Sequence, residues 1–337
     1  MLISASKVYQ VDALLAALKS AAEPTRLRLL ALLAHGEATV TELCKILSQS
    51  QPRVSRHLKL LTDGQLVRRY PEGSWVFYRL ADGPVAEQLV SPLLANLDWS
   101  DARLTSDRQR LEVVRAQRSA NAQAYFMEAA PHWNAIRSMH VDEAEVESAL
   151  QQVLGEAPVA NMLDVGTGTG RMLELLGPQA GRALGVDISH DMLRIARETL
   201  ERSAQPHVQA RQGDMYRLPS NAATHDLVLI HQVLHFADEP AAVIAEAARV
   251  LQPGGRVLMV DFAPHAVEEL RTRHQHRRLG FTEEEVLSWC AAAGLRGSVA
   301  ARLPGAPLTV LLWLAYKPAA ASAAGVLPPD EPALRDQ

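Results

Sequence analysis

The strongest constraint on the fold is the segment MLDVGTGTGRMLELL at 162–176, which has the pattern of a strand, a glycine-rich turn and a helix start. Its three glycines let the backbone approach a ligand closely and adopt unusual dihedral angles. Apolar strand candidates then alternate with helical segments as far as residue 316, which predicts parallel β-α-β units in a doubly wound sheet. We expect seven strands, at 162–165, 183–187, 208–212, 227–230, 256–260, 298–301 and 310–316. The last two have no helix between them, so we expect one of these two to run antiparallel.

The residues around this turn favour a nucleoside ligand without a pyrophosphate. A dinucleotide fingerprint needs glycine where Arg171 stands, and no Lys-Ser or Lys-Thr pair follows as in a P-loop. Asp164 adds negative charge that repels pyrophosphate but suits a cation. Asp187 ends the second strand, 19 residues after the second glycine, where a carboxylate can accept two hydrogen bonds from a ribose diol. Asp214 ends the third strand and can meet an adenine amino group, with Met215 lining the ring.

From about 121 to 316 the motifs LDVGTGTG, GVDIS, QGDMYRLP, HDLVLIHQVLHFADEP and LQPGGRVLMVDF follow in an order that resembles class I S-adenosylmethionine-dependent methyltransferases. The resemblance implies a Rossmann-like α/β fold, S-adenosylmethionine as cofactor and S-adenosylhomocysteine as product. It also implies a small-molecule acceptor, because the Asn-Pro-Pro-Tyr signature of many base-methylating enzymes is replaced by His-Gln-Val-Leu at 231–234. Arg137 is a further candidate contact. The residues assigned to the cofactor are Tyr125, Asp164, Gly166, Gly168, Gly170, Asp187, Ile188, Met192, Asp214, Met215, His231 and Gln232.

Methyl transfer from a sulfonium requires an aligned donor and acceptor, and it requires a base only when the acceptor carries a proton. His231 and His235 are the candidate catalytic bases because they follow the fourth strand at the expected active edge. Asp261 and the histidines of RTRHQHRRLGF are alternatives. We expect no metal, because the histidines at 265–276 have no strong ligand spacing and the chain has only two cysteines.

The N-terminal part differs in charge from the rest: residues 1–118 carry a net charge of +4, and the remainder carries −8. This asymmetry favours a polyanion as partner of the first part, although a solvated basic face would give the same balance. The segment at about 51–62 predicts a helix whose apolar residues face a core and whose cations lie on another face. Such a helix can dock in the DNA major groove, with a basic hairpin at 66–70 and 75–80 acting as a wing.

The segments SAAEPTRLRLLALL, TELCKIL, QSQPRVSRHLKLLTDGQLVRR and EGSWVFYRL resemble the ArsR-type winged helix-turn-helix repressors over about 10–100. The resemblance implies double-stranded operator DNA as a partner and a homodimer formed by helices around 11–20 and 85–97. It departs from the metal sensors of that family, because Cys44 stands alone and 84–118 has no histidine. The candidate DNA contacts are Gln51, Arg53, Ser55, Arg56, His57, Lys59, Arg68 and Arg69.

The sequence therefore predicts four regions: a DNA-binding and dimerisation domain at 1–100, a linker at 101–120, a methyltransferase domain at 121–317 and a loose tail at 318–337. The polar stretch at 98–110 is the expected hinge. A cytoplasmic location fits the lone cysteines and the absence of signal and membrane segments. Two functions remain open: a regulator fused to a small-molecule methyltransferase, and a non-catalytic sensor of S-adenosylmethionine or S-adenosylhomocysteine that controls operator binding. An enzyme that uses its first domain only to dimerise is disfavoured by the basic helix.

Overall fold

The computed structural model describes residues 10–72, 75–81, 86–133, 142–203 and 205–319. Its N-terminal domain combines helices with a small antiparallel sheet in the order β1-β3-β2, and the hairpin of β2 and β3 forms the predicted wing. The elements are α1 (Val11–Ala21), α2 (Pro24–Leu33), β1 (Ala38–Thr39), α3 (Val40–Leu47), α4 (Gln51–Asp63), β2 (Val67–Glu72), β3 (Trp75–Leu80), η1 (Ala86–Val90) and α5 (Ser91–Ala95).

Local sequence explains where these helices begin. Pro24 occupies the first turn of α2, where its missing N–H removes no helical hydrogen bond. Thr39 caps α3 through a reciprocal pair of hydrogen bonds with Glu42, at 3.3 and 2.8 Å. Ser50 occupies the N-cap position of α4, but its side chain makes no capping hydrogen bond.

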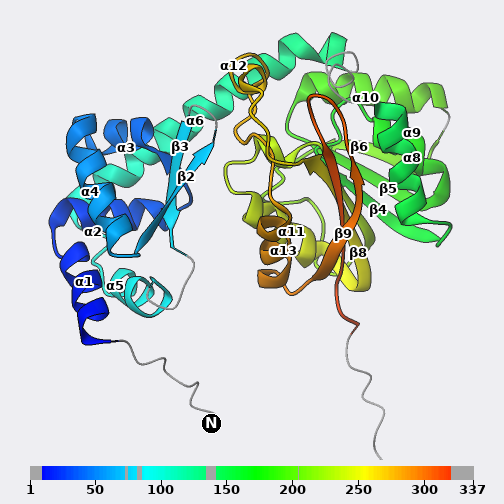
Figure 1. The fold of residues 1–337 in the computed structure, drawn as a ribbon. Coiled ribbons are helices and arrows are strands. Elements are labelled where there is room, and N and C mark those ends of the chain that lie inside the picture. Colours follow the sequence, from blue (N-terminus) through cyan, green and yellow to red (C-terminus); the bar gives the residue numbers. More distant parts are fainter. Residues whose placement is uncertain (1–9, 73–74, 82–85, 134–141, 204, 320–337) are drawn as a thin grey trace, which may run out of the picture.

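The prediction of a hinge at 98–110 is wrong, because one continuous helix, α6 (Ala102–Ala129), covers most of that stretch. This helix is anchored to the first domain where Arg28 forms two hydrogen bonds of 2.6 Å with the buried Asp107. Arg110 adds a third contact to the same carboxylate at 2.7 Å. As Figure 1 shows, α6 then continues across to the C-terminal domain, so the connection between domains is a packed helix.

The C-terminal domain is the predicted doubly wound sheet, with seven strands in the order β6-β5-β4-β7-β8-β10-β9. Strand β10 runs antiparallel to both neighbours, which confirms the expectation for the last two strands. Several strands are longer than predicted, because backbone pairing with the neighbouring strands continues into ends that are exposed or half-buried. Their bounds are β4 (Val159–Val165), β5 (Ala180–Asp187), β6 (Val208–Gln212), β7 (His225–His231), β8 (Leu251–Phe262), β9 (Arg296–Leu303) and β10 (Val310–Tyr316).

Helices cover both faces of this sheet and bury two apolar clusters (Figure 1). One cluster contains residues of α8 (Glu143–Leu154), α9 (Arg171–Leu176) and α10 (His190–Ser203). The other contains residues of α11 (Pro240–Val250) and α13 (Glu283–Ala292). Short helices complete the domain: η2 (Ala130–His132), η3 (Gly177–Gln179), η4 (Leu234–Phe236) and α12 (Glu268–His274). Residues 320–337 of the expected tail lie outside the described residues.

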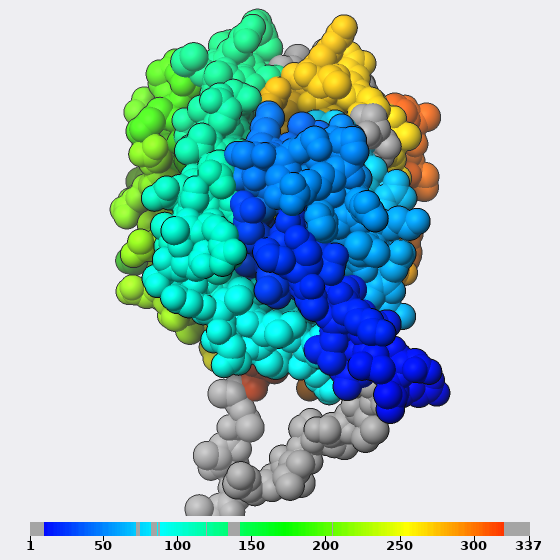
Figure 2. Space-filling view, turned by 90° about the vertical axis from the view of Figure 1, so that its left-hand side faces the viewer, coloured from blue at the N-terminus to red at the C-terminus, as the bar shows by residue number. Residues whose placement is uncertain are grey.

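The two domains pack against each other through charged side chains. Arg278 Nη1 lies 2.6 Å from Glu37 Oε1, and Arg115 on α6 lies 2.5 Å from Glu239. Figure 2 shows the N-terminal domain and α6 spread over one face of the molecule, with the segment around α12 adjoining them. The wing, β2 and β3, lies on the side of the first domain that faces the large sheet, while α1 and α4 lie on the far side (Figure 1).

Candidate functional site

The glycine-rich turn between β4 and α9 packs tightly on two sides and opens on a third. Gly166 has a φ of +70°, and a Cβ there would lie 2.3 Å from a methyl carbon of Val233. Gly170 has a φ of +83°, and a Cβ there would lie 3.0 Å from that of Ala196. Among the described residues, a Cβ on Gly168 would meet only the Trp133 ring, at 3.5 Å. The turn therefore requires glycine for its conformation and presents its centre to open space.

Asp187, at the end of β5, joins this turn to the next strand. One carboxylate oxygen accepts from the Gly168 N–H at 2.9 Å, and the other accepts from the Ser189 N–H at 2.8 Å. Burial raises the pKa of this carboxyl, while the backbone donors favour its charged form. Because a carboxylate oxygen has two lone pairs, each can accept one more hydrogen bond, as from a pair of hydroxyls.

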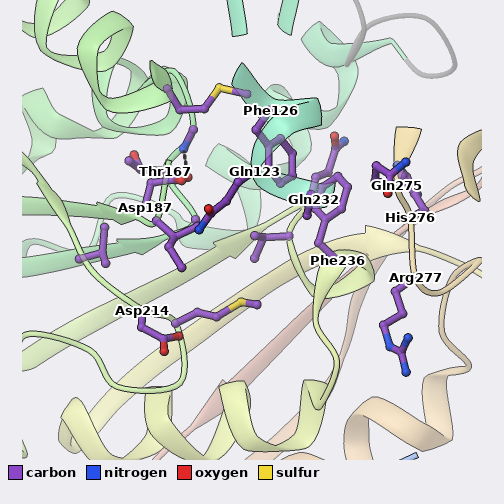
Figure 3. A pocket seen from close by; sticks show the side chains of 18 of the residues that line it. Gln123, Phe126, Thr167, Asp187, Asp214, Gln232, Phe236, Gln275, His276 and Arg277 are labelled. Atoms are coloured by element: carbon purple, nitrogen blue, oxygen red, sulfur yellow. Dashed lines mark hydrogen bonds between the residues drawn. The ribbon is translucent and has the colours of Figure 1, made fainter. Parts of the chain in front are cut away.

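A cavity of about 430 Å³ lies over the carboxyl ends of the parallel strands (Figure 3). This is where open α/β sheets bind ligands. It brings together all but two of the residues predicted to bind the cofactor. Those that line it are Asp164, Gly166, Gly168, Asp187, Ile188, Met192, Asp214, Met215, His231 and Gln232.

Tyr125 and Gly170 are the two exceptions. The Tyr125 hydroxyl lies 2.8 Å from His274 Nδ1, outside the cavity, and burial raises the pKa of this tyrosine to about 12. Its neighbour Phe126 points inward instead, because consecutive residues of a helix face different directions (Figure 3). Gly170 does not line the cavity and packs against Ala196 of α10. The proposed contact Arg137 lies outside the described residues.

The two candidate bases have different environments. His231 ends β7 and lines the cavity. His235 does not line it: η4 turns this ring into the core, where Nδ1 lies 2.8 Å from Asp261 Oδ1 and the ring stacks on His276 with centroids 3.9 Å apart. The structure therefore places His235 away from the cavity, with Asp261 as its buried partner.

The cavity has a second set of walls that the sequence did not predict. Phe126 packs edge-to-face on Phe236, with centroids 5.0 Å apart, and on Trp133, with centroids 5.6 Å apart. The remaining additions come from the expected linker, from the segment around α12, and from the wing of the other domain. They are Trp75, Arg118, Asn121, Gln123, Arg271, Gln275 and Arg277. His276, one of the alternative candidate bases, also lines the cavity here.

Four of the charged side chains at this boundary form a square. Glu42 on α3 lies 3.3 Å from Arg118 and 3.5 Å from Arg277. Asp238, after η4, lies 2.9 and 2.8 Å from the same two arginines. Burial alone would raise the pKa of Glu42, but the two guanidiniums hold it below its ordinary value. Burial and the charge of Arg277 lower the pKa of Arg118. The square joins the first domain, the connecting helix and the second domain.

The exposed face of α4 carries most of the predicted DNA contacts: Gln51, Arg53, Arg56 and Lys59, while Ser55 is half-buried. Arg68 and Arg69 are exposed on β2. His57 is turned the other way, with Nδ1 3.5 Å from Glu23 Oε2 at the start of α2, and burial lowers its pKa. It is therefore better described as a contact between helices.

In the wing, Arg79 lies 4.2 Å above the Tyr70 ring and 3.9 Å from Glu285 of the other domain.

The described residues contain no group of three or more His, Cys, Asp or Glu side chains placed to hold a metal ion. Cys44 is half-buried and Cys290 is buried; burial raises the pKa of both thiols, to about 11 for Cys290. None of the helices in the described ranges combines the length and the apolar character needed to cross a membrane.

Comparison with known proteins finds a family match in each of the two domains. The family "Methyltransferase domain" matches 163–259, and "Bacterial regulatory protein, arsR family" matches 23–69. The chain is 33% identical over 140 residues to the uncharacterized 37.1 kDa protein in transposon TN4556 of Streptomyces fradiae, covering 38% of this chain and 40% of that protein. It is 31% identical over 204 residues to the malonyl-[acyl-carrier protein] O-methyltransferase of Hahella chejuensis, covering 57% of this chain and 70% of that protein. The chain spans less than half the length of the first two curated relatives that it matches.

Among solved structures, the YcgJ protein of Bacillus subtilis matches 51% of this chain over 99% of its own, with a TM-score of 0.46 and 17% identity. The sheet order, the glycine-lined cavity and the family match define the C-terminal domain as a class I methyltransferase domain. The family match at 23–69 defines the first domain as an arsR-family helix-turn-helix. The chain belongs to the S-adenosylmethionine-dependent methyltransferases and carries this regulator domain at its N-terminus.

Proposed function

We propose that the C-terminal domain binds S-adenosylmethionine and transfers its methyl group to a small molecule. The observation that carries this proposal is the Asp187 carboxylate, held by the Gly168 and Ser189 N–H groups at the rim of the cavity. Met192 and Met215 offer apolar surface beside it, and Asp214 stands at the outer edge. This donor and acceptor set suits a nucleoside with a free ribose diol.

When bound, S-adenosylmethionine supplies an electrophilic methyl group on a sulfonium; the acceptor atom bonds to that carbon as the carbon–sulfur bond breaks, leaving the neutral thioether S-adenosylhomocysteine. The protein holds both reactants in line, which by itself accounts for much of such catalysis. Asp164, buried beside the turn, contributes negative charge that favours a cationic ligand. If the acceptor atom carries a proton, His231 and His276 are the histidines of the cavity lining that could receive it.

The test is calorimetry on the full chain. We expect one S-adenosylhomocysteine to bind per chain with micromolar-class affinity, because the product lacks only the transferred methyl group. Absence of binding in the folded protein would remove the basis of the proposal.

The first domain is proposed to bind double-stranded operator DNA as a cytoplasmic homodimer. The exposed cations of α4 support the DNA contact. The dimer is supported by an apolar stripe on α1 that the described chain leaves open to solvent, at Val11, Leu14, Leu15 and Leu18.

A second candidate function is sensing, in which occupancy of the cavity controls operator binding without methyl transfer. The observation that favours it is the charge square, since Arg118 and Arg277 line the cavity and also contact Glu42 of the DNA-binding domain. Operator titrations with S-adenosylmethionine, with S-adenosylhomocysteine and without ligand distinguish the two. Equal DNA affinities in all three would reject the sensor.

A further inference from the structure

The cavity continues past the predicted cofactor residues to the boundary between the domains. Figure 3 shows Gln275, His276 and Arg277 on the side opposite Asp187 and Asp214, with Phe126 and Phe236 between the two ends. The cavity thus has two chemically different parts, and the distal part lies beyond the residues predicted to bind the nucleoside.

The walls of the distal part are aromatic and come from both domains. Phe126, Trp133 and Phe236 form a contiguous group of rings with edge-to-face and tilted contacts. Trp75, the first residue of β3 in the wing, is 39% exposed and contributes the wall from the DNA-binding domain. Such rings favour a flat, unsaturated ligand, because ring faces and edges attract each other when offset or perpendicular.

The charged groups of the distal part favour an anion. In the described part of the chain, the guanidinium groups of Arg118, Arg271 and Arg277 line it, and Asp238 is the one carboxylate on this lining beyond the three aspartates of the cofactor end. The other carboxylates that pair with these arginines, Glu42 and Glu268, lie outside the lining, so the groups presented to a ligand here are mainly N–H donors. The Arg271 guanidinium lies 4.8 Å from the centre of the Trp75 ring. A planar guanidinium binds a carboxylate with two parallel hydrogen bonds, so these groups suit a planar anionic substituent.

We propose that the distal part is the methyl-acceptor subsite, that the wing completes it through Trp75, and that it takes an aromatic molecule bearing an anionic group. This inference rests on the proposed methyltransferase function and adds the acceptor class and a wall from the other domain.

The test uses a fluorescent anionic aromatic probe, 8-anilinonaphthalene-1-sulfonate, and its neutral analogue, N-phenyl-1-naphthylamine. Both are titrated into the full chain saturated with S-adenosylhomocysteine. We expect the anionic probe to bind with one-to-one stoichiometry and at least about tenfold more tightly than the neutral one, which corresponds to about 1.4 kcal/mol. Binding that the cofactor product abolishes, equal binding of the two probes, or no binding would overturn the proposal.

Two variants locate the probe. Trp75→Ala and Arg118→Gln should each weaken the anionic probe at least about fivefold, while S-adenosylhomocysteine affinity stays within about twofold. The matched controls are Trp99→Ala, which removes a similarly exposed tryptophan away from the cavity, and Arg108→Gln on the outer face of α6. Unchanged probe affinity in both test variants contradicts the subsite. Loss of product binding in the wild type, in contrast, contradicts the proposed function itself.

Discussion

The guanidinium of Arg271 lies over the ring of Trp75, 4.8 Å from its centre, so the methyltransferase domain contacts the tip of the DNA-binding wing. Arg271 is buried, and its Nη1 lies 3.2 Å from Glu268 on the same helix. A cation over a partly exposed aromatic ring is a favourable contact of about 1 kcal/mol. The wing is therefore engaged by the second domain, while the exposed face of α4 is free to meet DNA.

Replacing Asp187 with alanine should weaken S-adenosylhomocysteine binding at least about 100-fold. Two hydrogen bonds to a charged acceptor contribute about 1.5–3 kcal/mol each. Calorimetry measures the affinity. Asp187→Asn removes the charge and keeps one oxygen acceptor, which can accept from either the Gly168 or the Ser189 N–H but not from both. Asp191→Ala, an aspartate of the same domain that does not line the cavity, is the control. Wild-type affinity in the Asp187 variants would refute the assigned ribose site.

Removing Arg53 and Arg56 together should abolish specific binding to an operator selected in vitro and reduce the salt dependence of residual binding. Each phosphate contact that is lost lowers the slope of log affinity against log salt by about one unit. Gel-shift titration at several salt concentrations gives both quantities. S-adenosylhomocysteine affinity should not change, and Arg194→Ala, an exposed arginine on α10, should leave DNA binding intact. An unaffected shift in the double variant rules out α4 as the recognition helix.

Changing Glu42 to glutamine should destabilise the protein at neutral pH by about 3 kcal/mol, because it leaves two guanidiniums sharing one carboxylate. Glutamine can still close the capping box of α3, so the change isolates the charge. The pKa of Glu42 is held below its ordinary value of 4.5, so its contribution is fully present above that pH and is lost as the pH falls toward the lowered pKa.

Denaturant unfolding of the wild type and of Glu42→Gln at pH 7 and in acid measures this effect. The two proteins should differ at pH 7 and converge in acid. Glu201→Gln, on the exposed side of α10, controls for a general change in net charge. A difference that persists unchanged in acid would mean that the square does not depend on the Glu42 charge.

Leu15→Glu should convert a dimer into a monomer, because it places a charge in the exposed apolar stripe of α1. Leu15 is 44% exposed, and Leu60 on α4 is similarly exposed at 40%, so Leu60→Glu is a matched control. Sedimentation velocity gives the mass of each. A wild type that is monomeric at micromolar concentration, or a Leu15 variant that stays dimeric, contradicts a dimer built on this helix.

Local chemistry determined most of the fold. Proline at the start of α2, the reciprocal Thr39–Glu42 cap and the glycine-rich turn specify their elements from neighbouring residues, and the strands follow from apolar runs between polar ends. For the same reason most of the predicted cofactor residues line one cavity. They sit at the carboxyl ends of parallel strands, and the topology brings those ends together.

The tertiary structure decided what depends on the direction of a side chain or on the packing of one domain against another. Tyr125 and Phe126 are adjacent aromatic residues, and only the orientation of α6 selects Phe126 for the cavity. His235 looks like a base beside a strand end, but η4 turns it onto Asp261. The segment predicted as a hinge is instead held against the first domain by Arg28 and Asp107, which are far apart in the chain.

Trp75 shows most clearly which features local sequence determines and which only the packing of the domains decides. The sequence by itself determined that it belongs to a wing and that the chain joins a DNA reader to a methyltransferase domain. That this wing residue lines the cavity follows only from how the two domains pack. The physical reason is that hydrogen bonding and apolar periodicity act over a few residues, whereas a shared wall arises from long-range charge pairs and ring contacts that no local pattern encodes.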